Sequence, residues 1–359
     1  MQLRIPGPTP CPEEVLSSLS RQMINHRGEE FAELIWNLTE RLKNIFMTKG
    51  DVFILTSSGT GAMEASIVNT LSPGDRVLAL SNGFFGERFS GVASAFGAEV
   101  LKLDFEWGKA IEPEKVRDVL KKERDVKAVL VVHNETSTGL TNPLKEIARV
   151  VREYDRLLLV DAISSLSCIE LPMDEWGCDV VFTGSQKGFM VPPGLSFIAI
   201  NERGWEAYKK AKMPKFYWDL GKAKSFLEKG QTPWTPSIPI FFALDVALRL
   251  IEKEGLRNIF ERHKRVADKV REGIKELGLS LFPDERYASN TITAVRSPDG
   301  LDTRELLKIL REEYDVVLAG GQDRLSGKIF RIGHLGKVSE ADMDEVLRAI
   351  GSALSKMRR

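Results

Sequence analysis

The chain has 359 residues, of which 43% are hydrophobic and 28% are charged, so it carries enough apolar material for a folded core and too little polar bias for disorder. Its 51 Lys and Arg residues balance 51 Asp and Glu residues, and this net charge of zero argues against nucleic acid or an anionic membrane as a partner. The sequence contains no apolar run near the roughly 18 residues that span a bilayer, and it begins with neither a signal peptide nor a transit sequence, so we expect a cytoplasmic protein.

The cysteines and histidines do not indicate a metal site. The three cysteines, Cys11, Cys168 and Cys178, show no CxxC spacing, and the chain has only four histidines. A zinc site needs a full set of such ligands at close spacing. We therefore expect no bound metal.

The first part of the chain predicts an α/β fold. Short apolar runs rich in β-branched residues alternate with amphipathic stretches, and the runs lie at residues 52–56, 77–80, 126–132, 157–161, 180–183 and 196–200. Several runs are apolar without alternation, which is typical of strands covered on both faces. This pattern predicts a mostly parallel central sheet with helices on both faces.

After about residue 250 the pattern predicts a smaller α+β domain. Apolar residues between 256 and 277 share one helical face, Glu261 and Arg265 are spaced for an i,i+4 ion pair, and Gly278 is expected to end the helix. Further strands are expected at residues 291–295, 316–318 and 329–332, and further helices at 303–314 and 339–356. We expect three parts: an N-terminal arm (1–20), a large domain (21–253) and a small C-terminal domain (254–359).

The carboxyl ends of the predicted strands carry the candidate site, because ligands of open parallel sheets bind there. The first strand runs into Ser58, Gly59 and Thr60 and then into a helix. Small hydroxyls and unpaired helix N-terminal amides can hold a phosphate, although the spacing fits neither the dinucleotide fingerprint nor the Walker A loop. An ordinary helix-capping loop is the alternative.

Charged side chains stand at the ends of two later strands. Asp161 ends the run 157–161, where a buried carboxylate needs a cation or serves as a helix cap. Lys187 follows the run 180–183 between glycines, in the sequence GSQKG, whereas most lysines are solvated surface charges.

Two further segments complete the pattern. The sequence HNETSTG at residues 133–139 closes a strand with hydroxyl and amide groups, and Arg331 lies within an apolar strand. A buried guanidinium there suits a bound carboxylate, and the alternative is a structural ion pair with an internal Asp or Glu.

In this order along the chain, the motifs resemble those of the class V aminotransferases of pyridoxal phosphate fold type I. The resemblance rests on the phosphate cradle at 58–60, the NGFFG turn at 82–86, HNETSTG, the aspartate of VDA, the lysine of GSQK and the arginine of RIG. It covers essentially the whole chain and is strongest toward the alanine–glyoxylate and serine–pyruvate (serine–glyoxylate) branch, which the opening PGPTP also resembles.

The resemblance implies a role for each candidate residue. Lys187 would bind pyridoxal 5'-phosphate covalently and move the substrate proton, and Asp161 would pair with the ring nitrogen. The other roles it implies are phosphate binding by Ser58, Gly59, Thr60 and Gln186, ring stacking by Phe85, contact with the ring hydroxyl by Thr136, binding of the substrate α-carboxylate by Arg331, and closure of the site by the Gly7 backbone.

The resemblance also implies a homodimer with shared active sites. Trp234 and Ser237 lie where relatives reach a neighbouring subunit's cofactor, but Trp234 replaces a tyrosine and has no hydroxyl. His133 lies near the cofactor or, by the interpretation we favour, has a structural role.

The function that follows as an expectation is an aminotransferase that moves the amino group of alanine or serine to glyoxylate or pyruvate. An alternative donor is aspartate or 2-aminoethylphosphonate, with Arg27 or Arg88 as a second anion-binding arginine. The same scaffold would also suit a lyase or cysteine desulfurase, or a non-catalytic ligand-binding protein.

Overall fold

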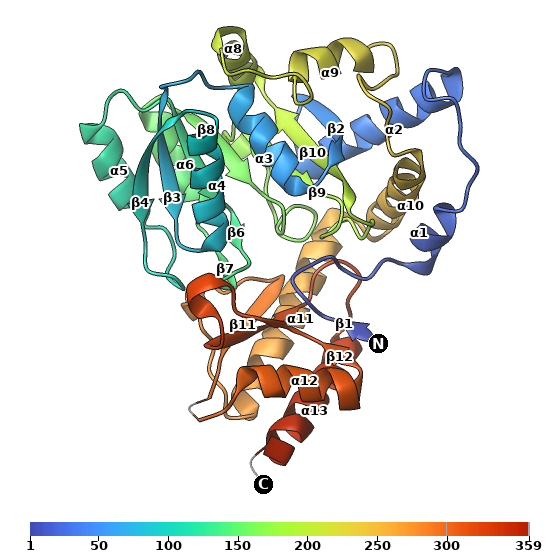
Figure 1. Cartoon of the computed structure of the whole chain (residues 1–359), viewed down its shortest axis with the longest axis vertical. Coiled ribbons are helices and arrows are strands. Elements are labelled where there is room, and N and C mark those ends of the chain that lie inside the picture. The colour runs from blue at the N-terminus through green and yellow to red at the C-terminus, as the bar shows by residue number, and fades with distance from the viewer. Residues whose placement is uncertain (299, 358–359) are drawn as a thin grey trace.

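The computed structural model describes residues 1–298 and 300–357, and within these ranges the chain folds around a seven-stranded sheet with a smaller unit beside it (Figure 1). The strand order is β2-β10-β9-β8-β5-β3-β4. From β9 to β4 all neighbours are parallel, whereas β10 is antiparallel to both β2 and β9. The expected mostly parallel sheet is therefore confirmed. Its strands are β2 (Asp51–Ser57), β3 (Arg76–Ser81), β4 (Glu99–Asp104), β5 (Ala128–Val132), β8 (Leu157–Asp161), β9 (Val180–Gly184) and β10 (Gly194–Ile200).

Helices cover both faces of this sheet. In β5, Val129 and Val131 pack into one apolar cluster while Ala128 and Leu130 pack into another on the opposite face, which explains the apolar run without alternation. The first cluster contains residues of α2 (Glu29–Phe46), α5 (Pro113–Lys122), α6 (Leu144–Glu153) and α10 (Ile238–Glu254). The second contains α3 (Gly59–Val68), α4 (Phe84–Ala95), α8 (Glu202–Lys210) and α9 (Leu220–Leu227).

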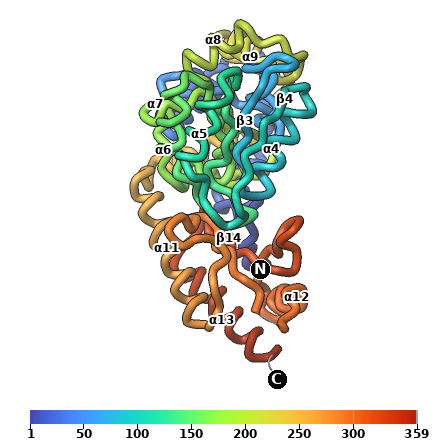
Figure 2. The backbone as a smooth tube through the Cα atoms, turned by 90° about the vertical axis from the view of Figure 1, so that its left-hand side faces the viewer, coloured from blue at the N-terminus to red at the C-terminus, as the bar shows by residue number. Residues whose placement is uncertain are grey.

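The smaller unit contains a three-stranded antiparallel sheet packed on helices, at the orange and red end of the chain in Figure 2. Its elements are β11 (Ile292–Arg296), β13 (Ala319–Gly320), β14 (Ile329–Gly333), α11 (Leu256–Glu276), α12 (Thr303–Tyr314) and α13 (Glu340–Met357). The later part of the predicted apolar stripe of α11, from Val266 to Leu277, packs into the core of this unit, whereas Ile259 at its beginning packs into the core of the large unit. Gly278 follows α11 with a φ of 73°, as expected of a helix-ending glycine.

One expected contact of α11 is wrong. Glu261 pairs with Arg257 at 3.2 Å, and Arg265 reaches Glu340 at 3.6 Å instead. The reason is tertiary: α13 packs along α11 and offers Arg265 a carboxylate that helical spacing alone does not reveal.

The N-terminal arm joins the two units. Strand β1 (Gln2–Leu3) pairs in parallel with β12 (Val316–Val317), and the buried Arg4 forms an ion pair with Asp342 at 3.0 Å. Farther along, the Thr9 amide donates to the Gln186 carbonyl at 3.0 Å, so the arm crosses from the small unit to the large one. The domain division at 253/254 stays a prediction, and the chain turns near it at Gly255, between α10 and α11.

The remaining elements are short. They are α1 (Glu13–Ser18), β6 (Asn134–Glu135), β7 (Leu140–Thr141), α7 (Met173–Trp176) and two 3-10 turns, η1 (Glu285–Tyr287) and η2 (Asp323–Leu325). Among the described residues, no helix has both the length and the apolar character needed to cross a membrane.

Candidate active site

A cavity of about 200 Å³ lies at the carboxyl ends of β2, β5, β8 and β9, where the sequence places the candidate residues. The structure brings eight of them together along its wall: Ser58, Gly59, Thr60, Phe85, Thr136, Asp161, Gln186 and Lys187. The wall also includes Arg88, Val132, Asn134, Ile163 and Ser164.

The amino end of α3 forms one side of the cavity. Ser58 is the N-cap of this helix, yet its side chain makes no capping hydrogen bond, so the first amides of α3 are left for an external acceptor. A Cβ at Gly59 would lie 2.6 Å from the end of the Ile163 side chain, so any larger residue there would have to displace that side chain. The side chain of Gln186 also lines the cavity, and its NH2 group is the part that could donate to a phosphate oxygen. Helix amides and an uncommitted amide side chain together suit a phosphate.

Asp161 is a buried carboxylate without a cation. Its side chain is 3% exposed, and one oxygen accepts a hydrogen bond from the Ile163 amide at 2.8 Å. Among the described residues no cationic side chain lies within 4 Å of it. Burial, with a smaller contribution from the nearby charge of Glu135, raises the pKa of Asp161 to about 7. A donor that carries positive charge, such as a protonated ring nitrogen, would complete this carboxylate.

Lys187 presents an amine of reduced basicity. Burial, together with the positive charge of Arg331, lowers its pKa to about 8. The amine donates to the Pro6 carbonyl on the N-terminal arm, and a Cβ at Gly7 would lie 2.5 Å from Nζ. Gly7 also has a φ of 128°, which favours glycine. The arm therefore closes directly over a lysine that is poised to act as a nucleophile.

Arg331 is a buried cation held by neutral acceptors. Its side chain is 4% exposed, and it donates to the Gly320 carbonyl at 3.0 Å, the Thr136 carbonyl at 3.1 Å and the Gln322 side chain at 3.0 Å. Within the described ranges no carboxylate lies within 4 Å of it, so the alternative of a structural ion pair is wrong. Its Nη2 makes no hydrogen bond to the described protein residues, which leaves the two N–H groups of this nitrogen for a carboxylate ligand.

Two predicted cofactor contacts do not lie at the cavity of this chain. Trp234 donates to the Tyr217 carbonyl at 3.1 Å and stacks on Phe216 and Tyr217. The Ser237 amide faces the Thr56 hydroxyl at 3.4 Å. Their predicted contact is with the cofactor of a neighbouring subunit.

His133 faces away from the cavity. It is 2% exposed, its ring meets Trp176 edge-on at 6.1 Å, and burial lowers its pKa to about 3. A neutral histidine packed against the helical layer agrees with the structural role favoured from the sequence.

The sequence interpretation missed Glu135 as part of the site. This residue is fully buried, and its carboxylate accepts hydrogen bonds from the Phe85 and Gly86 amides, each at 3.1 Å. The available signal was an acidic residue inside the otherwise neutral motif HNETSTG, since a buried carboxylate must meet several donors.

Arg27 and Arg88, which we considered as binders of a second anionic group of the substrate, lie in different parts of the structure. Arg27 donates to the Gln231 side chain at 2.9 Å and to the Thr232 carbonyl at 2.7 Å, so it is committed to holding that loop. Arg88 lines the cavity, and its guanidinium lies 5.1 Å and 4.9 Å from the ring centres of Phe84 and Phe85. No carboxylate within the described residues pairs with it at 4 Å.

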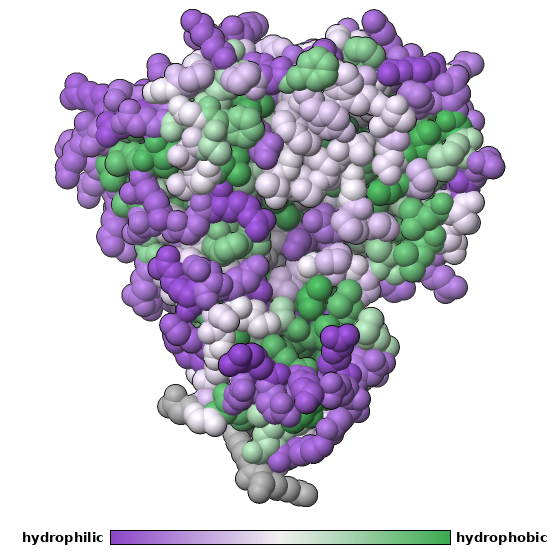
Figure 3. Space-filling model, in the orientation of Figure 1, coloured by the Kyte–Doolittle hydropathy of each residue, from purple (hydrophilic) through white to green (hydrophobic). Residues whose placement is uncertain are grey.

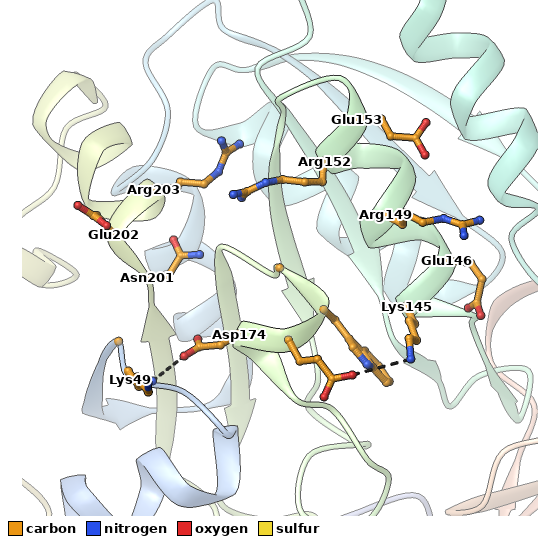
Figure 4. A pocket seen from close by; sticks show the side chains of 14 residues that line it. Lys49, Lys145, Glu146, Arg149, Arg152, Glu153, Asp174, Asn201, Glu202 and Arg203 are labelled. Atoms are coloured by element: carbon orange, nitrogen blue, oxygen red, sulfur yellow. Dashed lines mark hydrogen bonds and ion pairs between the residues drawn. The ribbon is translucent and has the colours of Figure 1, made fainter.

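A larger cavity of about 970 Å³ lies at the opposite end of the sheet, and Figure 4 shows the side chains that line it. Its walls carry basic and acidic side chains in equal measure, including Lys145, which faces Glu175 at 3.8 Å. None of the predicted site residues lines it. Among the described residues, moreover, no group of three or more His, Cys, Asp or Glu is arranged to hold a metal ion.

Comparison with known proteins identifies the family. The family model described as Aminotransferase class-V matches residues 4–337, which is most of the chain. The chain belongs to this family. Its aminotransferase function and the fold type I architecture expected from the sequence are thereby confirmed, and membership implies pyridoxal phosphate as the cofactor.

Individual relatives cover nearly the same length. The chain is 45% identical to the soluble hydrogenase small subunit of Synechococcus sp. over 99% of this chain and 93% of that protein. It is 35% identical to the L-aspartate–glyoxylate aminotransferase of Paracoccus denitrificans (94% and 87% covered) and 34% identical to the serine–glyoxylate aminotransferase of Methylorubrum extorquens (95% and 88%). Among solved structures, the alanine–glyoxylate aminotransferase of Nostoc sp. superposes with a TM-score of 0.95 at 32% identity, covering 98% of this chain and 94% of that one.

Proposed function

We propose that this class-V aminotransferase binds pyridoxal phosphate in the 200 Å³ cavity and moves the amino group of alanine or serine to glyoxylate or pyruvate. The observation that carries the proposal is the meeting of three incomplete groups in one cavity: the Lys187 amine with its lowered pKa, the Asp161 carboxylate without a cation, and the uncapped amino end of α3. Each is costly when buried alone, and one phosphate-bearing pyridine aldehyde would complete all three.

The residues present fit that cofactor. The amides of Gly59 and Thr60 and the side chain of Gln186 would hold the phosphate, Phe85 would stack on the ring, and Asp161 would face the ring nitrogen. When bound, pyridoxal phosphate supplies an electron sink for the charge left when the donor's Cα–H bond breaks, and it carries the amino group between the two substrates.

The side chains of this protein would orient the substrate and move its Cα proton. Arg331 offers its free Nη2 to the substrate α-carboxylate and thereby orients the neighbouring Cα. The Lys187 amine would remove the Cα proton, and its pKa of about 8 suits a base that works near neutral pH. The Pro6 and Gly7 backbone covers the amine and excludes water.

The arginines of the site favour a small amino donor. The names of two comparison proteins, an alanine–glyoxylate and a serine–glyoxylate aminotransferase, support the same choice. Arg27 is committed to its loop and cannot serve a second carboxylate. Aspartate is the second candidate, because Arg88 lines the cavity without a carboxylate partner and one relative is an L-aspartate–glyoxylate aminotransferase.

The lyase and desulfurase alternative is disfavoured by the cysteines. A nucleophilic thiol has a lowered pKa and an accessible, electropositive setting. Burial instead raises the pKa of Cys11, Cys168 (to about 11) and Cys178. The Synechococcus relative is named as a hydrogenase subunit. We do not propose hydrogenase activity for this chain, because the charged groups of the cavity are a lysine, an arginine and an aspartate rather than thiolate or imidazole metal ligands.

The spectrum of the cofactor-loaded protein tests the proposal. Alanine or serine should bleach the visible absorbance of the bound cofactor, and glyoxylate or pyruvate should restore it. In steady-state assays with one fixed acceptor, kcat/KM for alanine or serine should exceed that for aspartate by roughly tenfold, since a side-chain carboxylate that finds no partner costs that much. A tenfold preference for aspartate would overturn the small donor and assign Arg88 to the second carboxylate. An absorbance that no amino acid changes would overturn the aminotransferase itself.

We also propose a homodimer in which the loop 231–237 reaches the partner's cofactor. A cytoplasmic location is proposed from the sequence, which has no apolar run of membrane-spanning length. Apolar surface runs along the side of the molecule on which α1 and α2 lie (Figures 1 and 3). Leu16 and Trp36 of these helices are about half exposed, as is Tyr217, and Phe216 is 70% exposed. Patches of this kind mark protein contacts.

A dilution experiment tests the dimer. Light scattering should report twice the chain mass, and Trp234→Ala should raise the dimer dissociation constant by roughly tenfold or more, because an aromatic contact of this size is a typical interface anchor. Lys122→Ala is the control: this exposed lysine ends α5, on the other side of the molecule in Figure 1, and its loss should leave dissociation unchanged. A monomer that keeps full activity at high dilution would contradict the proposal.

A further inference from the structure

Glu135 is a fully buried carboxylate that the chemistry above does not use, and it lies between two residues that line the cavity, Asn134 and Thr136. Oε2 accepts the Phe85 and Gly86 amides at 3.1 Å each, and Oε1 accepts the amide and hydroxyl of Ser137 at 3.1 Å and 2.5 Å. The same hydroxyl accepts the Phe84 amide at 2.9 Å. The first three amides of α4 are therefore satisfied by two side chains from another segment.

These contacts fix the residue expected to stack on the cofactor. The first amides of a helix have no partner within the helix, so an external acceptor decides where the helix begins. Glu135 binds the backbone of Phe85 itself, and the ring of Phe85 is flanked by Phe84 at 5.6 Å and by Arg88 at 4.9 Å. Gly83 makes this approach feasible, because a Cβ there would collide with the Glu135 side chain.

The segment that carries Glu135 also anchors the substrate-binding arginine. The Thr136 carbonyl accepts Nη1 of Arg331 at 3.1 Å. Asn134 donates to the Thr291 hydroxyl at 3.0 Å, which ties the same segment to the smaller unit. Residues 134–137 thus contact the helix that bears the stacking ring on one side and the residues around Arg331 on the other.

We propose that Glu135 is a positioning residue that locks Phe85, through the first turn of α4, to the segment that anchors Arg331, so that the cofactor ring and the substrate carboxylate meet at a fixed separation. The inference rests on the proposed function, because it concerns the cofactor and substrate of that site. The charge of Glu135 also affects two other residues of the site. It raises the pKa of Asp161, as burial does, and it raises the pKa of Arg331, which burial lowers.

Glu135→Gln is the direct test, and Asp179→Asn is its matched control. Glutamine keeps the shape of the side chain but replaces one acceptor oxygen with an NH2 donor, which faces at least one backbone N–H whichever way the amide is turned. Asp179 is also a buried carboxylate, 1% exposed, that accepts a backbone amide, from Leu158 at 2.9 Å, but it lies at the other end of the sheet. Three quantities are measured: hydrogen exchange of amides 84–86 in the cofactor-free protein, the visible circular dichroism of bound pyridoxal phosphate, and KM for alanine.

In Glu135→Gln we expect exchange of amides 84–86 to accelerate roughly tenfold or more, KM to rise roughly tenfold, and the circular dichroism band to lose about half its amplitude, because at least one of the hydrogen bonds that Glu135 accepts is replaced by a contact between two donors. Asp179→Asn should lower Tm and leave these three quantities nearly unchanged. If Glu135→Gln changes only Tm, as the control does, Glu135 is merely structural and the proposal is overturned.

A second variant covers the case in which Glu135→Gln does not fold. Ser137→Ala keeps the carboxylate but removes the hydroxyl that links it to the Phe84 amide. It should change the same three quantities in the same direction by a smaller factor, and unchanged values would overturn the proposal. Failure of the proposed function is seen separately, because the wild-type protein would then bind no cofactor or show no absorbance change with alanine.

Discussion

Replacing Lys187 with alanine is expected to abolish transamination while the protein still folds. The variant loses both the covalent hold on the cofactor and the base for the Cα proton, so kcat should fall by roughly 10⁴-fold or more. The fold should survive because the amine makes one hydrogen bond to protein, to the Pro6 carbonyl, and its lowered pKa shows that the charged form is disfavoured by burial. The amino end of α3 and Asp161 remain to hold the cofactor without a covalent bond.

The measurement is kcat in a coupled assay, together with Tm and cofactor binding by equilibrium dialysis. Lys145→Ala is the matched control, since this exposed lysine lies at the opposite end of the sheet and faces Glu175 at 3.8 Å. It should leave kcat unchanged. A general base contributes roughly 100-fold or more to the rate. A Lys187→Ala protein that kept roughly a hundredth or more of the wild-type kcat would therefore show that another group removes the proton.

The sequence predicted the cavity well because of a property of parallel sheets. Apolar runs locate the strands, and the residue types at their carboxyl ends then lie together, as Ser58, Asp161 and Lys187 do here. The antiparallel direction of β10 was not predicted. A strand buried on both faces has the same apolar run whether its neighbours are parallel or antiparallel, so residues 196–200 carry no signal of direction.

The missed features depend on contacts between distant segments. Glu135 and the Phe85 amide are fifty residues apart in the chain, and no local pattern joins them. The pairing of β1 with β12 involves two residues on each strand, which is too short for a periodic signal. The expected pair of Glu261 with Arg265 failed for the same kind of reason, since Glu340 approaches from another helix.

Replacing Asp161 with asparagine is expected to leave cofactor binding in place but to lower kcat by roughly 100-fold or more. The carboxylate can hold a proton on the ring nitrogen, and a neutral amide cannot, so the charge that develops when the Cα–H bond breaks is less well stabilised. The Ile163 amide, which donates to Asp161 at 2.8 Å, can donate equally to the asparagine oxygen, so the local backbone should be unchanged. An unaltered kcat would show that the ring charge does not matter in this enzyme.

The stability of the cofactor-free Asp161→Asn protein gives a second, independent readout. Burial raises the pKa of Asp161 to about 7, above its value of about 3.9 in an unfolded chain, so the protonated side chain favours the folded state. This contribution is fully present below about pH 4 and is lost as the pH rises through about 7, whereas asparagine does not titrate. Urea unfolding at pH 5 and pH 8 should therefore show wild type losing stability relative to the variant at the higher pH. Bound pyridoxal phosphate should remove that loss of stability in the wild type, because its protonated ring supplies the missing cation. A difference in unfolding free energy that changes neither with pH nor with cofactor would contradict a pairing between Asp161 and the ring.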